Sequence, residues 1–130
     1  MSSRSVCVVD DDDLYRELLE MMVKLHCGVG EVRCFASGED ALEAFANSRF
    51  KRVPDLMLLD FHMGGMDAPA VIRSLKSQGI DLPVAVVSGA TRDGEREACL
   101  AAGAVDFLPK TARFEELLAG IQTLTDSFLP

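Results

Sequence analysis

The stretch SVCVVDDDD, residues 5–13, decides how this chain is read. Its first five residues form an almost unbroken apolar run, which is typical of a strand buried on both faces of a parallel sheet. Four carboxylates follow at once, from Asp10 to Asp13. Because neighbouring like charges repel one another and resist burial, this row indicates either a solvated turn or a site for a cation.

The same alternation of a short apolar run and an amphipathic segment continues to the end of the chain. The predicted strands are residues 5–9, 32–35, 55–59, 83–87 and 106–108. The predicted helices are residues 13–25, 38–47, 68–78, 94–103 and 112–128. This order predicts an α/β domain of the flavodoxin-like type. We expect a doubly wound, five-stranded parallel sheet in the order 2-1-3-4-5, with helices on both faces.

Two helix starts carry a recognisable cap. Ser37 is followed three residues later by Asp40, and Asp67 precedes a helix with Pro69 in its first turn. The first helix is predicted to be amphipathic, with its apolar side formed by one stripe of residues at helical spacing. This stripe is Leu14, Leu18, Met21, Met22 and Leu25.

Composition sets the class of protein. The chain has 130 residues, 48% of them hydrophobic, which predicts a single globular domain over residues 1–130. The formal net charge of −8 argues against direct nucleic-acid binding by this domain. No signal peptide or membrane-spanning run is evident, and the four cysteines are scattered without metal-ligand spacing. We therefore expect a cytoplasmic protein with no membrane partner.

Polar residues stand where four of the predicted strands end. Asp10 and Asp11 follow the first strand, Asp60 the third, Ser88 the fourth, and Lys110 the fifth. In an open α/β sheet these positions meet at one edge, near the point where the strand order reverses. Crowded carboxylates need a cation, and their oxygens suit Mg²⁺ or Mn²⁺. Asp12 and Asp13 are assigned instead to the start of the first helix.

This set of residues has a coherent chemical use. A carboxylate can act as a nucleophile and carry a phosphoryl group, and Asp60 is the central candidate. Lys110 could pair with one phosphoryl oxygen while the Ser88 hydroxyl donates a hydrogen bond to another.

Four short motifs resemble the receiver domain of two-component response regulators. They are VVDD (residues 8–11), LLD (58–60), VVSGA (86–90) and FLPK (107–110), in the order and approximate spacing of that family. The resemblance implies that Asp60 accepts a phosphoryl group from a sensor histidine kinase or a phosphotransfer protein. It also implies Mg²⁺ held by Asp10, Asp11, Asp60 and the main-chain carbonyl of His62. The His62 ring would be either a modulator of hydrolysis rate or a solvated side chain.

The resemblance implies an output as well. Ser88 would move toward the phosphoryl group, and the aromatic ring of Phe107 would turn inward. The face formed by the fourth helix, the fifth strand and the last helix would then change for an effector domain or a downstream protein. Homodimer formation on phosphorylation is a further expectation. Such a domain is regulatory and not an enzyme, beyond catalysing its own phosphorylation and dephosphorylation.

Two other functions compete with this interpretation. A pseudo-receiver of the same fold would act as an unphosphorylated protein-interaction module, but it would lack one of the key acids or the lysine. A phosphatase of the haloacid dehalogenase type would carry a DxD nucleophile motif after the first strand and a substrate cap. Here the candidate acceptor lies in DFH, residues 60–62, after the third strand.

Overall fold

A computed structural model describes residues 4–47, 49–50, 52–89 and 92–130. Five parallel strands form one sheet in the order β2-β1-β3-β4-β5. The strands are β1 (Ser5–Val9), β2 (Glu31–Phe35), β3 (Leu56–Leu59), β4 (Val84–Ser88) and β5 (Asp106–Pro109). The helices are α1 (Asp13–His26), α2 (Gly38–Ala46), α3 (Ala68–Ser77), α4 (Glu95–Ala102) and α5 (Phe114–Phe128). The predicted fold class and strand order are confirmed.

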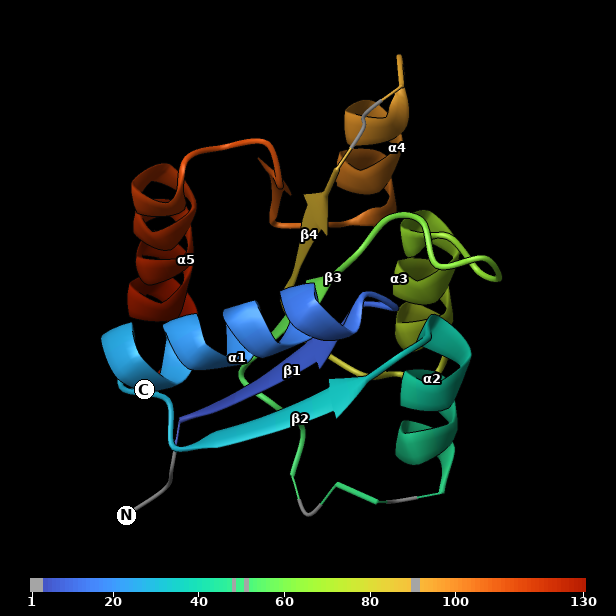
Figure 1. The fold of residues 1–130 in the computed structure, drawn as a ribbon. Coiled ribbons are helices and arrows are strands. Elements are labelled where there is room, and N and C mark those ends of the chain that lie inside the picture. The colour runs from blue at the N-terminus through green and yellow to red at the C-terminus, as the bar shows by residue number, and fades with distance from the viewer. Residues whose placement is uncertain (1–3, 48, 51, 90–91) are drawn as a thin grey trace.

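Helices cover both faces of the sheet (Figure 1). α1 and α5 pack on one face, while α2, α3 and α4 lie side by side on the other. Alternate residues of the central strands serve the two resulting cores, as the pleat of a strand requires. In β1, for example, Val6 and Val8 face α1 and α5, whereas Cys7 and Val9 face α2 and α3. All of β1, β3 and β4 is buried, which is why their sequences read as continuous apolar runs.

The predicted helix caps are present. Ser37 Oγ accepts a hydrogen bond from the Asp40 N–H at 3.0 Å, and Asp67 Oδ1 accepts one from the Ala70 N–H at 3.0 Å. Asp12 is the N-cap of α1, as the split of the acidic row predicted. Most boundaries differ from expectation by one residue, for example β3, which begins at Leu56, and β4, which extends to Ser88. The start of α5 differs by two residues, since this helix begins only at Phe114.

The predicted apolar stripe of α1 is only partly a core face, because Met22 is buried and Leu18 packs against the core, whereas the other three residues are exposed. Leu14 and Leu25 are 78% and 71% exposed, and Met21 is 45% exposed. The buried residues of this helix are Leu19, Met22 and Val23, which share one face at spacings of three and four residues. Two apolar stripes therefore run along α1, and the sheet buries only one of them. The other remains on the outer surface of the domain.

The two ends of the described chain lie together, far from the carboxyl edge of the sheet. Arg4 Nε donates a hydrogen bond to the carbonyl of Pro130 at 2.8 Å, and Arg4 Nη1 donates to the carbonyl of Cys27 at 2.8 Å. The carboxyl ends of the strands, opposite these contacts, carry the polar residues singled out above. Among the described residues, no helix is long and apolar enough to cross a membrane.

Candidate functional site

Three carboxylates converge at the carboxyl edge of the sheet. Asp10 follows β1 and Asp60 follows β3, and the two strands are neighbours. The side chains of Asp10, Asp11 and Asp60 each place one oxygen within 4.8 Å of the others. Asp10 is 1% exposed and Asp60 7% exposed, whereas Asp11 lies on the surface. The arrangement predicted from the strand ends is therefore present in the structure.

Lys110 lies against these carboxylates. Its ammonium nitrogen is 2.7 Å from Asp10 Oδ2 and 3.6 Å from Asp60 Oδ1. The main-chain N–H of Lys110 donates to the carbonyl of Ser88 at 2.7 Å, which holds the end of β5 against the end of β4. The ammonium thus offsets part of the negative charge at the site, and it has two acceptors between which it can move.

Asp60 is harder to ionise in this environment than an ordinary aspartate. Burial of the carboxyl, followed by the negative charge of Asp10, raises the pKa of Asp60 from 3.8 to about 6, although Lys110 acts in the opposite direction. A cation placed among the three carboxylates would favour the ionised form and offset the repulsion. An ionised Asp60 is also the form that can attack an electrophilic phosphorus atom.

The donor set fits a hard divalent cation. Asp10 Oδ2 is buried, and no hydrogen-bond donor among the described residues is aligned with it, although the Lys110 ammonium lies close by as an ion-pair partner. Asp10 Oδ1, in contrast, accepts a hydrogen bond from the Asp12 N–H at 2.9 Å. A buried carboxylate oxygen with a free lone pair beside two further carboxylates is the environment that Mg²⁺ or Mn²⁺ prefers.

The side chain of His62 points to a partner that the sequence did not suggest. Its Nε2 lies 2.7 Å from Glu95 Oε2, and the imidazole ring is 52% exposed while the Glu95 side chain is 10% exposed. Glu95 Oε1 also accepts a hydrogen bond from the Arg92 N–H at 2.6 Å. The segment after β3 is thereby joined to the first turn of α4. The sequence left two roles open for the His62 ring, a modulator of hydrolysis rate or a solvated side chain. The contact with Glu95 shows that the ring is not freely solvated.

The two predicted switch residues are both buried. The Ser88 hydroxyl has no hydrogen-bond partner among the described residues, so it is free to bond to a group that enters the site. The Phe107 ring is 6% exposed and packs in the core beneath α4 with Val86 and Cys99. The movement of Phe107 on phosphorylation stays a prediction. Ala90, the last residue of the VVSGA motif, lies outside the described residues.

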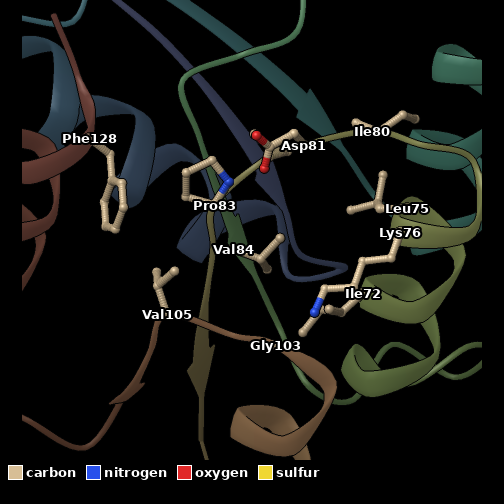
Figure 2. Close-up of a pocket in the computed structure, with 11 residues that line it drawn as sticks. Ile72, Leu75, Lys76, Ile80, Asp81, Pro83, Val84, Gly103, Val105 and Phe128 are labelled. Carbon is tan, nitrogen blue, oxygen red and sulfur yellow. The ribbon is translucent and has the colours of Figure 1, made fainter.

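A second hollow lies at the opposite edge of the sheet (Figure 2). It has a volume of about 330 Å³ and is bordered by the end of α3, the segment before β4, and Phe128 of α5. Its charged lining groups are Lys76 and Asp81, and its walls are otherwise mostly apolar. This hollow faces the amino end of β4, whereas ligands of open α/β sheets bind beyond the carboxyl ends. The acidic edge therefore remains the candidate site.

Comparison with known proteins shows which family the domain belongs to. Residues 6–122 match the sequence profile of the response regulator receiver domain. The chain belongs to this family. It is a regulatory domain of two-component signalling, in line with the resemblance seen in its four motifs.

Individual relatives are similar over nearly the whole chain. Response regulator MprA of Mycobacterium sp. (strain KMS) is 40% identical over 119 residues, which are 92% of this chain and 49% of that protein. MprA of Mycobacterium leprae (strain TN) is also 40% identical over 119 residues. The signal receiver domain of a NarL response regulator from Mycobacterium tuberculosis superposes with a TM-score of 0.81 at 27% identity, covering 97% of this chain and 98% of that one. The chain spans about half the length of the curated relatives it matches.

Two residues of the site were missed at the level of sequence. Glu95 carried no signal, since an acid in the first turn of a helix is ordinary. Tyr15 did carry a sequence signal, because it lies two residues after the acidic row and is the only tyrosine of the chain. In the structure its ring lies 4.4 Å from the Lys110 ammonium nitrogen.

Proposed function

We propose that this receiver domain is a phosphorylation-dependent signalling switch in which Asp60 accepts the phosphoryl group. The donor is a sensor histidine kinase or a phosphotransfer protein, and Mg²⁺ or Mn²⁺ is held by Asp10, Asp11, Asp60 and the main-chain carbonyl of His62. One observation carries the proposal: a nearly buried carboxylate, Asp60, shares the Lys110 ammonium with a second buried carboxylate, Asp10.

The transfer is a single displacement at phosphorus. One carboxylate oxygen of Asp60 forms a bond to phosphorus, and the bond from phosphorus to the donor breaks. In phosphohistidine the electron pair stays on the ring nitrogen, and a proton on the other ring nitrogen keeps the released imidazole neutral. A divalent ion held by the three carboxylates would neutralise negative charge on the phosphoryl oxygens.

Lys110 and Ser88 hold the transferred group. The Lys110 ammonium exchanges its contact with Asp10 for one phosphoryl oxygen, since a dianion attracts it more strongly than a single carboxylate. The Ser88 hydroxyl, which has no partner in the described part of the chain, donates a hydrogen bond to another oxygen, and this draws the end of β4 toward Asp60.

The output is a shift between two packings. Movement of Ser88 changes the space beside Phe107, whose ring is buried in this structure. Phosphorylation would favour the packing in which this ring is turned inward. The surface made by α4, β5 and α5 then presents a different shape to an effector domain or a downstream protein, or to a second copy of the chain. We place the protein in the cytoplasm, and we assign it no enzyme activity beyond its own phosphorylation and dephosphorylation.

The alternative function is that of an unphosphorylated interaction module. Such a module would lack one acid of the pair after β1, the phosphoryl acceptor after β3, or the lysine after β5. In this chain all of them are present and lie close together, as Asp10, Asp11, Asp60 and Lys110. Phosphorylation is therefore the function that the geometry supports best.

Incubation with Mg²⁺ and acetyl phosphate tests the proposal. We expect one phosphoryl group per chain, stable in acid, labile in base and hydroxylamine, and absent from Asp60→Asn. Label that persists in Asp60→Asn would refute the assignment of the acceptor. A wild-type protein that takes up neither phosphate nor the beryllofluoride mimic would favour the interaction module.

A further inference from the structure

Tyr15 is a part of the site for which the proposed switch has no use. It is the third residue of α1, and the Asp12 cap fixes its backbone by accepting a hydrogen bond from the Tyr15 N–H at 3.2 Å. The centroid of its ring lies 4.4 Å from Lys110 Nζ. Its hydroxyl oxygen is buried and has no hydrogen-bond partner among the described residues.

We propose that Tyr15 is a positioning residue for phosphoryl transfer, whose ring holds the Lys110 ammonium in place while the anion facing it changes. The inference rests on the proposed role of Asp60 as acceptor. It assigns Tyr15 no contact with the phosphoryl group itself.

A lysine side chain needs such support. Its ammonium ends a flexible four-carbon stem, and at this site two carboxylates compete for it, at 2.7 Å for Asp10 and 3.6 Å for Asp60. The face of an aromatic ring attracts a cation, most strongly where water is excluded, and the Lys110 side chain is only 18% exposed. The ring therefore restricts the ammonium to the space between the two acids.

A neutral partner suits an ammonium that has to change its anion. A third carboxylate at this position would bind Lys110 more strongly and oppose its transfer to a phosphoryl oxygen. An aliphatic side chain would exclude water but would not attract the cation. The aromatic ring attracts it at every stage of the exchange, because its interaction does not depend on which anion lies opposite.

The phenol stays neutral throughout. Burial, together with the negative charges of Asp10 and Asp60, raises the pKa of Tyr15 to about 12. Because the hydroxyl has no acceptor among the residues that the structure describes, it is not expected to fix the ring, and phenylalanine should perform the same task. Tyr15→Phe is therefore the conservative variant, and Tyr15→Leu removes the aromatic face while keeping an apolar side chain.

The test compares the rate of labelling by acetyl phosphate in wild type, Tyr15→Phe and Tyr15→Leu, with Leu14→Ala as the matched control. Leu14 is the neighbouring residue of α1 and is largely exposed. Because acetyl phosphate is a small molecule, it needs no docking surface that the loss of the Leu14 side chain would damage. We expect Tyr15→Leu to label about 5- to 30-fold more slowly. Tyr15→Phe and Leu14→Ala should remain within about twofold of wild type.

The affinity for Mg²⁺, measured from the rise of melting temperature with Mg²⁺ concentration, separates positioning from general damage. We expect it to be unchanged in Tyr15→Leu, because the three carboxylates are intact. A parallel loss of Mg²⁺ affinity, a wild-type labelling rate in Tyr15→Leu, or an equally slow Tyr15→Phe would each overturn the inference.

Intrinsic fluorescence tests the contact independently of phosphorylation. Tyr15 is the sole tyrosine of a chain without tryptophan, so the emission on tyrosine excitation reports this one ring. We expect the emission to differ between wild type and Lys110→Ala. Identical emission would overturn the positioning role whether or not Asp60 is labelled. If the wild type shows the emission difference but takes up no phosphoryl label, the proposed function would be contradicted. The role of Tyr15 during phosphoryl transfer would then be contradicted as well.

Discussion

Replacing Asp60 by asparagine is expected to stabilise the metal-free protein at neutral pH. The pKa of Asp60 in the fold is about 6 against 3.8 for an ordinary aspartate, chiefly because the carboxyl is buried and secondarily because Asp10 is close. One pKa unit corresponds to about 1.4 kcal/mol, so ionising Asp60 costs the fold on the order of 2–3 kcal/mol. Asparagine has nearly the same shape and no charge, and it avoids this cost.

The dependence on pH has a definite sign. Below pH 3.8 the carboxyl is neutral in both the folded and the unfolded protein, and the stability linked to its raised pKa is fully present. This stability is lost as the pH rises toward and through about 6, because only the unfolded chain ionises freely. The advantage of Asp60→Asn should therefore be full at pH 7.5 and nearly absent at pH 4.

Urea unfolding in the presence of a chelator measures the difference. Asp81→Asn is the matched control, since it removes one exposed negative charge at the opposite edge of the sheet. Its free energy of unfolding should stay within about 0.5 kcal/mol of wild type. The reasoning fails if Asp60→Asn is no more stable than wild type at pH 7.5, or if its gain is as large at pH 4. Saturating Mg²⁺ should reduce the gain, because the ion stabilises the folded wild type.

Three further predictions separate the remaining roles at this edge of the sheet. Asp12→Ala should lower the free energy of unfolding by about 1 kcal/mol, because the helix cap is lost, while the affinity for Mg²⁺ is preserved. Asp11→Ala should weaken Mg²⁺ binding, measured from the melting temperature, with little change in stability. The reverse pattern would contradict the assignment of Asp11 to the metal site and of Asp12 to the helix cap. Lys110→Ala should destabilise the metal-free protein by about 3 kcal/mol, because it leaves Asp10 buried without its counter-charge, and Mg²⁺ should restore part of the loss; unaltered urea stability would contradict the buried ion pair. Absorbance at alkaline pH should show Tyr15 ionising near pH 12 in the folded protein. The stability linked to this raised pKa is complete below pH 10 and is lost as the pH rises through 12. A midpoint near pH 10 in the folded protein would mean that the hydroxyl is exposed.

The fold was predictable because its strands and caps leave local signals. β1, β3 and β4 are buried on both faces, so each reads as an apolar run, and Ser37 and Asp67 mark the starts of α2 and α3. The location of the site followed from the strand ends, because parallel strands bring their carboxyl ends to one edge. These inferences use only neighbouring residues and the known geometry of the sheet.

What the sequence could not settle depends on which way side chains point. α1 carries two apolar stripes, and the periodicity of Leu14, Met21 and Leu25 is as good as that of the residues that are in fact buried. The contacts of Tyr15 with Lys110 and of His62 with Glu95 join segments far apart in the chain. No local pattern encodes such pairs, since they arise only when α1, β5 and α4 have been placed on the sheet.

The site draws its groups from nearly the full length of the chain. Asp10 comes from the end of β1, Asp60 from the end of β3, and Lys110 from the end of β5, which follows the other four strands of this sheet along the chain. A growing chain on the ribosome holds the two acids long before it holds the lysine that offsets part of their charge. If Asp60 accepts a phosphoryl group as proposed, a chain that ends before β5 would lack Lys110 and should accept that group more slowly than a chain that contains it.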